Sequence, residues 1–310
     1  MQTRWRPLWM VAALVSVCGV CASQPDEAAE AAPTRLRRRE PIRFNPPPDC
    51  EHRFACAVSG QLKASFWGRH RVRGEATMLR KVLLVDPAND LVRISTGLES
   101  GICRVDDTAK QVGGEPPLIC DFDARHRLLR VSKSGDPAGT EEVASASILD
   151  LGSVMMFLFY SVPFHVRTAG VGTAWDAEYS CVDVNGDAVT LSGSHELIAF
   201  MFEGGRRVAV IRSDLQIPVY GKINRYRLSG TLQCKVISEV YVDCGGLRYR
   251  DSVGAGTLKA SGGIISVDVD VSDLRNTLRL ILPNGSPAEP LYDPTHPPAD
   301  PTGGGQVPQS

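Results

Sequence analysis

The chain has 310 residues, and its 34 Lys and Arg residues nearly balance its 35 Asp and Glu residues, leaving a formal net charge of −1. Domains that bind nucleic acid carry a basic surface, so this balance gives no reason to expect a nucleic-acid partner. Hydrophobic residues make up 43% of the chain, which is enough for one large β domain or two halves of modest size.

Residues 1–22 have the pattern of a secretory signal peptide. Arg4 and Arg6 precede an apolar run that is shorter than the roughly 20 residues of a spanning helix. Small residues at the end of the run predict cleavage after Ala22, and therefore export to the periplasm, the cell surface or the medium. A lipid anchor at Cys18 or Cys21 is the less favoured alternative, because each follows a Val where a small residue is expected. An uncleaved anchor is the third reading.

Two segments without apolar periodicity flank the expected domain. Residues 23–49 are rich in Ala, Pro and charged residues and predict a disordered linker, while residues 284–310 predict a disordered Pro/Gly tail. The basic run at 35–40 leaves association with a membrane surface open, although a solvated charge run is favoured. The β-rich domain is therefore expected over residues 50–283.

Alternation of apolar and polar residues dominates this domain and predicts many strands. VNGD at 184–187 carries the Asn-Gly pair of a tight hairpin turn, and Gly-rich turns separate the other strands. Many antiparallel strands at short spacing imply an open or closed barrel, or a strongly curved sheet. We predict a mainly β (α+β) fold, with an antiparallel curved sheet or half-barrel packed on one apolar helix.

The helix is expected at residues 141–162, where the alternation stops. Acidic residues open the segment, Pro163 ends it, and its apolar residues recur at helical spacing. Burial against the concave face of the sheet is favoured over a re-entrant membrane role, because Asp150 lies inside the segment. The helix would join two halves, 50–140 and 164–283, whose similar layout raises the idea of a duplication.

Cysteines provide the next prediction. Removal of the signal peptide leaves seven, and in an oxidising compartment these are disulfide candidates before they are metal ligands. Hairpin turns near Glu239 and at 113–117 would bring together two pairs, and a bend would bring together a third. The predicted pairs are Cys234 with Cys244, Cys103 with Cys120, and Cys50 with Cys56. Cys181 is expected to be a buried, inert thiol.

Motifs for catalysis, metals and cofactors are incomplete. His195 and Glu196 lack the second histidine of a zinc protease motif, because Ala199 stands in its place. The acids of 183–187 and 268–273 lack the full ligand run of a calcium loop. Three arginines of one strand face, Arg69, Arg71 and Arg73, could meet a phosphate or an anionic headgroup, although an ordinary solvent face is favoured. We expect no catalytic residues, no metal and no cofactor.

The segment that follows the predicted helix resembles an uncharacterised family of secreted bacterial envelope proteins. In that family an apolar helix leads to a Pro, a short β segment and Gly-x-x-Trp at the start of a long strand. The matching positions are Pro163, Val166, Gly172 and Trp175, and the resemblance covers about residues 140–282. The layout is also loosely similar to the half-barrel of bacterial lipoprotein carriers. The resemblance adds to the fold prediction and carries almost no function.

These observations predict an exported, non-catalytic envelope protein that binds a lipid or another apolar small molecule between sheet and helix. The expected binding residues are Met155, Phe157 and Phe159 of the helix and Trp175 of the following strand. Two alternatives stay open. One is a structural or adhesive envelope module without a cavity, and the other is an exported hydrolase whose site is assembled from distant residues.

Overall fold

A computed structural model describes residues 41–64, 68–114, 116–133, 162–165, 168–182, 188–223, 226–262 and 265–293. Twelve strands occupy these ranges, and no helix occurs within them. The strands are β1 (Glu51–Ala64), β2 (Gly68–Asp86), β3 (Leu91–Val105), β4 (Thr108–Val112), β5 (Leu118–Phe122), β6 (Leu128–Lys133), β7 (Ala174–Val182), β8 (Ala188–Glu203), β9 (Arg206–Ile223), β10 (Tyr226–Tyr241), β11 (Leu247–Gly262) and β12 (Ile265–Leu280).

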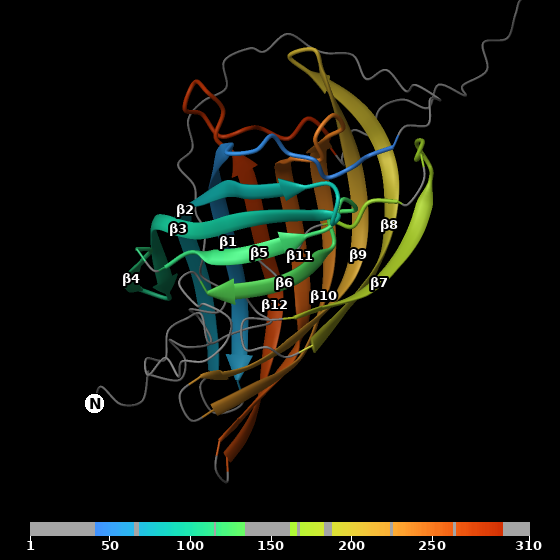
Figure 1. The fold of residues 1–310 in the computed structure, drawn as a ribbon. Helices are drawn as coiled ribbons and strands as arrows, with labels where there is room; N and C mark the ends of the chain where they lie inside the picture. Colours follow the sequence, from blue (N-terminus) through green and yellow to red (C-terminus); the bar gives the residue numbers. More distant parts are fainter. Residues whose placement is uncertain are drawn as a thin grey trace, which may run out of the picture.

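The sheet closes on itself. Its order is β2-β1-β12-β11-β10-β9-β8-β7-β6-β5-β3-β4, and β2 also pairs with β3, so eleven strands form a closed barrel with β4 attached to β3 (Figure 1). Neighbouring strands are antiparallel except β6 and β7, which share one parallel pair, Arg130 with Val182. The predicted antiparallel β fold is confirmed, and the predicted curved sheet or half-barrel is a full barrel.

The predicted helix at 141–162 falls almost entirely outside the described residues. Val162 is described, and it begins a short irregular segment that ends at His165. A packed apolar helix therefore has no support from the described part of the chain. None of the described segments is a helix with the length and apolar character needed to cross a membrane.

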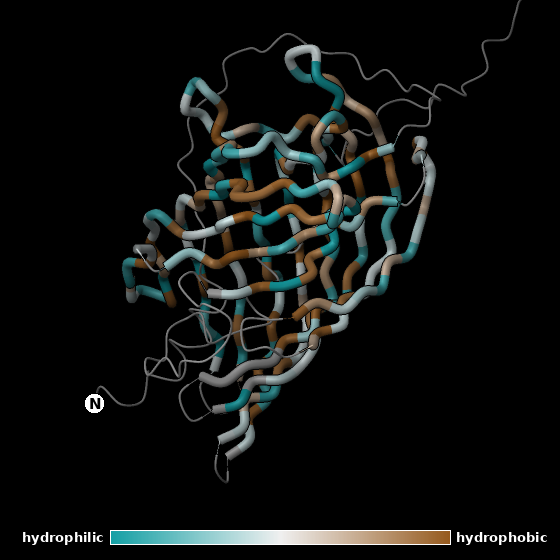
Figure 2. The backbone as a smooth tube through the Cα atoms, viewed as in Figure 1, coloured by the Kyte–Doolittle hydropathy of each residue, from teal (hydrophilic) through white to brown (hydrophobic). Residues whose placement is uncertain are grey.

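Alternation along each strand decides which face lies inside the barrel. In β1, the buried residues Phe54, Cys56 and Val58 alternate with residues of the outer face such as Arg53. The same two-residue period runs along the other long strands, where hydrophobic and hydrophilic residues follow one another (Figure 2). The buried face forms one continuous apolar core, and the outer face is largely polar.

Small residues and bulges let the long strands curve into a barrel. The pairing of β1 with β12 shifts between Ser59 and Gln61, and that of β11 with β12 shifts between Gly254 and Gly256. A side chain at Gly254 would place its Cβ 2.8 Å from Cys234 Sγ, so glycine permits this close approach. Bulges of this kind bend a strand and increase its twist, as closure requires.

Residues 41–50 and 282–293 cross one end of the barrel, which we call the capped end (Figure 1). The Phe44 N–H donates to the Ala124 carbonyl at 2.8 Å, and the Ala288 N–H donates to the Leu280 carbonyl at 2.7 Å. The side chains of Ile42, Phe44 and Ala288 are buried. The linker predicted up to residue 49 and the tail predicted from residue 284 therefore each contribute an ordered part to the domain.

None of the three predicted disulfides is formed, because all seven cysteines of the described residues are free. Cys234 lies in the middle of β10, which runs without a turn through Glu239 and ends at Tyr241, about 23 Å farther along the strand, and Cys244 lies in the turn beyond that end. Cys120 pairs with Ile94 of β3, nine residues from Cys103, and Cys50 and Cys56 belong to one extended run. A disulfide needs Cα atoms within about 7 Å.

Thiol counting tests this correction. Without reductant, we expect the protein beginning at Ser23 to show all seven thiols of Cys50 to Cys244 when unfolded in urea. Five of them are buried in the folded state, and burial raises the pKa of Cys120 and of Cys234 to about 12, so they should react slowly before unfolding. A count of one thiol in urea would contradict the structure and restore the three predicted disulfides.

Candidate binding site inside the barrel

The interior of the barrel is the candidate site, because its lining is largely apolar and contains a buried charge without a counterion among the described residues. Barrel diameter grows with strand number: about eight strands give an interior that side chains just fill, and larger barrels enclose ligands or a central element. Here eleven strands close the ring. The inward lining is apolar over most of its length and includes Phe54, Val58, Leu62, Val72, Met78, Ile94, Leu118, Leu191, Ile217, Leu232, Val269 and Leu278.

Arg80 is a charged exception in this apolar lining. Alternation along β2 places it on the inner face, on the same side as Met78 and Val82, and its side chain is only 8% exposed. The guanidinium lies 5.5 Å from the centre of the Phe54 ring. Its Nε has no hydrogen-bond partner, and no ion pair to it occurs among the described residues. Burial lowers the pKa of Arg80 from its ordinary value.

Two polar residues on the strands beside Arg80 do not neutralise it. Arg80 is paired in register with Thr96 of β3, and Thr96 hydrogen-bonds Cys120 of β5. Burial raises the pKa of the Cys120 thiol to about 12, even though the positive charge of Arg80 lowers it. A thiol with that pKa is uncharged at neutral pH, so the Arg80 charge remains uncompensated by this group.

Aromatic rings close the capped end beside this charge. His126 packs against Phe44, Phe122 and Phe164 with ring centres 4.1, 5.3 and 5.2 Å away. Burial lowers the pKa of His126 to about 3, with Arg80 and Arg250 contributing, while a hydrogen bond with the Val162 backbone raises it. His126 is therefore a neutral ring at physiological pH and adds no positive charge to the site.

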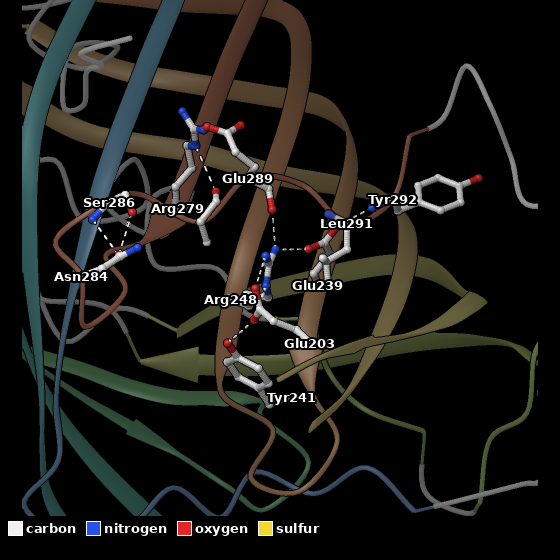
Figure 3. A network of polar contacts seen from close by, with 11 residues as sticks. Glu203, Glu239, Tyr241, Arg248, Arg279, Asn284, Ser286, Glu289, Leu291 and Tyr292 are labelled. Carbon is white, nitrogen blue, oxygen red and sulfur yellow. Dashed lines mark hydrogen bonds and ion pairs between the residues drawn. The ribbon is translucent and has the colours of Figure 1, made fainter. Parts of the chain in front are cut away.

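A second buried arginine, Arg248, differs from Arg80 because its guanidinium is fully paired with acceptors of the protein (Figure 3). Arg248 donates to Glu203 at 2.5 and 2.8 Å, to Glu239 at 2.6 Å, and to the Glu289 carbonyl at 2.6 Å. Tyr241 also donates to Glu203, at 2.7 Å. Every side of this guanidinium meets an acceptor, in contrast to Arg80.

The same network fastens the C-terminal segment to the barrel (Figure 3). Glu239 has no exposed surface and accepts the backbone N–H groups of Leu291 and Tyr292 at 2.7 and 2.9 Å. Arg279 reaches Glu289 by an ion pair and donates to the Ala288 carbonyl at 3.1 Å. These contacts are satisfied by the protein itself, which indicates a structural role for them.

Of the four binding residues predicted from the sequence, Met155, Phe157 and Phe159 lie outside the described residues. Trp175 begins β7 and is half-buried, and its indole N–H donates to the Pro163 carbonyl at 3.0 Å. Its ring lies 5.5 Å from that of His195, its partner in β8. Trp175 thus ties the 162–165 segment to the barrel wall.

Sequence reasoning missed Arg80, although the signal was present. In RGEATMLRKVLLV, positions 76, 78, 80 and 82 share one face, so an arginine falls between Met78 and Val82 on the core side. His126 could not be found in this way, because it lies in a turn between β5 and β6 with φ of 62°. Its aromatic neighbours come from three separate segments of the chain.

On the outer surface, the arginines predicted to share a strand face do so. Arg69, Arg71 and Arg73 of β2 line a groove of about 550 Å³ together with Arg104, Asp106 and Asp107. Asp106 is already occupied, because it accepts the Arg71 backbone N–H at 2.8 Å and lies 2.7 Å from His70 Nδ1. This groove faces solvent and is separate from the barrel interior.

Comparisons with known proteins do not assign a role to this site. Protein-family models, curated proteins and solved structures give no match to this chain. Within the described ranges, no cluster of three or more His, Cys, Asp or Glu side chains could hold a metal ion. The barrel interior, with its apolar lining and its buried arginine, is therefore the feature on which a functional proposal rests.

Proposed function

We propose that this protein is an exported, non-catalytic envelope protein that holds a lipophilic small molecule inside its barrel. The observation that supports this most is the closed eleven-stranded wall with an apolar inner face, since closed barrels of more than about eight strands commonly enclose a ligand or a central element. The signal-like segment at 1–22 supports export.

The chemistry of the interior favours binding over the hydrolase alternative. A cysteine nucleophile must be a thiolate, and burial raises the pKa of Cys120 and Cys234 to about 12. A general base must be able to reach the substrate, but His195 is only 2% exposed. Its Nδ1 lies within hydrogen-bond distance of Ser213 Oγ, at 2.8 Å. The buried carboxylate of Glu239 is held by Arg248 and backbone amides.

As a second part of this proposal, the segment 141–162 would form one side of the ligand site inside the barrel. Its apolar residues Met155, Phe157 and Phe159 would then face the ligand, with the barrel strands on the other side. Two observations support this part of the proposal: the apolar helical spacing of the segment, and its position in the chain immediately before the Val162–His165 stretch that packs at the capped end.

Mass spectrometry of the exported protein tests the proposal. The native spectrum should carry an extra mass of a few hundred daltons, on the scale of one lipid or similar apolar molecule, that disappears on denaturation. Extraction with organic solvent should recover the same compound. A native mass equal to the denatured mass, together with failure of the extracted protein to bind an uncharged apolar dye, would favour the structural or adhesive module instead.

A pair of substitutions places the ligand inside the barrel. Val58 faces inward and is 4% exposed, whereas its neighbour Ser59 faces outward and is exposed. Val58→Trp should weaken binding of N-phenyl-1-naphthylamine by about tenfold or more, because the larger indole ring takes up interior volume that the dye would need. Ser59→Trp should leave dye binding unchanged. Urea unfolding of both variants separates loss of binding from loss of folding.

A further inference from the structure

The starting point is the energetic contrast between two buried arginines. Arg248, with a side chain 3% exposed, is surrounded by two carboxylates and a carbonyl. Arg80 is buried to a similar degree, yet no carboxylate contacts it within the described part of the chain, and its Nε has no partner. Moving a charge out of water without a counterion is energetically unfavourable. A buried charge that has no counterion in the protein is therefore a candidate for binding an anion from outside.

The surroundings of Arg80 define what that partner looks like. Beside the guanidinium lie the Phe54 ring, the Thr96 and Cys120 pair, and the neutral ring of His126 at the capped end. Away from the capped end, the lining is mostly apolar, for example at Val58, Leu62 and Val72, with the buried Asn276 beside Val58 as a polar exception. The site therefore has a cationic, hydrogen-bonding end and a long apolar remainder.

We propose that Arg80 binds the anionic group of an amphiphilic ligand whose alkyl chain lies along the apolar interior. This inference rests on the proposed function and adds the chemical class of the ligand, an alkyl chain that ends in a carboxylate or a phosphate. A planar guanidinium donates two parallel hydrogen bonds to either group, and such charge-assisted bonds are strong where water is excluded. The anion would supply the counterion that the described wall does not.

Calorimetric titration of the solvent-extracted, full-length exported protein tests this. The probes share a twelve-carbon chain: dodecanoate, dodecyl phosphate and uncharged dodecanol. We expect the wild type to bind at least one of the two anions about 10- to 100-fold more tightly than dodecanol, the range given by one charged hydrogen-bonding contact. The two anionic probes distinguish a fatty-acid-like ligand from a phosphate-bearing one.

Two variants assign the preference to Arg80. Arg80→Met removes the inward charge and should abolish the preference for anions while dodecanol binding persists. Lys81→Met removes an equal charge from the adjacent, exposed position and should leave the preference intact. Arg80→Met should also keep or raise the unfolding midpoint of the ligand-free protein, since an unpaired buried charge is removed. If it does not fold, Arg80→Lys serves instead, and should retain the preference with weaker affinity.

The outcomes separate the two proposals. If none of the three probes binds and extraction yields no ligand, the proposed function is overturned together with this inference. If dodecanol binds as tightly as both anions, or if the preference survives in Arg80→Met, the barrel is a carrier of apolar molecules and only the role of Arg80 is overturned.

Discussion

Replacing Arg248 by Ala is expected to lower the free energy of unfolding by about 3–5 kcal/mol, as found when one partner of a buried ion pair is removed. The loss has a clear physical cause, because Glu239 is fully buried and would keep only the two backbone amides of Leu291 and Tyr292. Glu203 would keep only Tyr241 as a donor. Urea unfolding followed by circular dichroism measures the change.

Arg212→Ala is the matched control for this experiment. Arg212 pairs with Glu196 at 2.5 Å, but the two side chains are 58% and 35% exposed, so solvent screens the pair and its loss should change stability by less than about 1 kcal/mol. Hydrogen exchange adds a local readout, since the amides of Leu291 and Tyr292 should exchange faster in Arg248→Ala. Equal unfolding free energies for the two variants would contradict the structural role of the network.

Acidification from pH 7 to pH 5 is expected to reduce the free energy of unfolding by about 2 kcal/mol for each of two buried histidines. Burial lowers the pKa of His126 to about 3 and that of His195 to about 4, against an ordinary value of 6.5. Below pH 6.5 these two histidines become protonated in the unfolded chain but stay neutral in the folded protein. Stability is therefore complete above this value and falls until the folded pKa is reached.

Non-titrating variants test the assignment. His195→Gln and His126→Asn should each reduce the pH dependence between pH 7 and 5, and Asn is chosen at 126 because it tolerates the positive φ there. Burial also lowers the pKa of His52, which contributes in the same direction and remains in both variants. Glu203 does not interfere, because the hydrogen bonds from Arg248 lower its pKa below 4.5, and its contribution is lost only under more acidic conditions. An unchanged slope in the double variant would contradict the two low pKa values.

The interior of the barrel therefore has two kinds of buried polar group with different consequences. The Arg248 network is complete within the chain and should affect stability and the position of the C-terminal segment. Arg80 is incomplete within the described residues, so its substitution should affect ligand preference more than stability. Measuring both properties for both arginines distinguishes a structural charge from a binding charge.

Local pattern alone was sufficient to predict the strands and the all-antiparallel character of most of the sheet. Alternation in β1 and β2 assigns one face to the core at nearly every position, because a strand turns successive side chains to opposite sides. That rule also places Arg80 on the inner face, so the charged position was contained in the sequence. The lack of a counterion for Arg80 could not be predicted, because no local pattern shows which groups will surround an inward side chain.

Closure of the sheet, pairing of cysteines and order at the termini were decided by tertiary structure. Closure needs β1 between β2 and β12, a contact between segments more than 200 residues apart in the chain. A hairpin near Glu239 was predicted from a polar residue that in fact sits in an unbroken β10 and is satisfied by Arg248 and the backbone of 291–292. The sequence by itself determines which residues form strands and which face is apolar. Only the tertiary structure decides which distant groups satisfy a buried charge, because those partners are brought together by closure of the barrel.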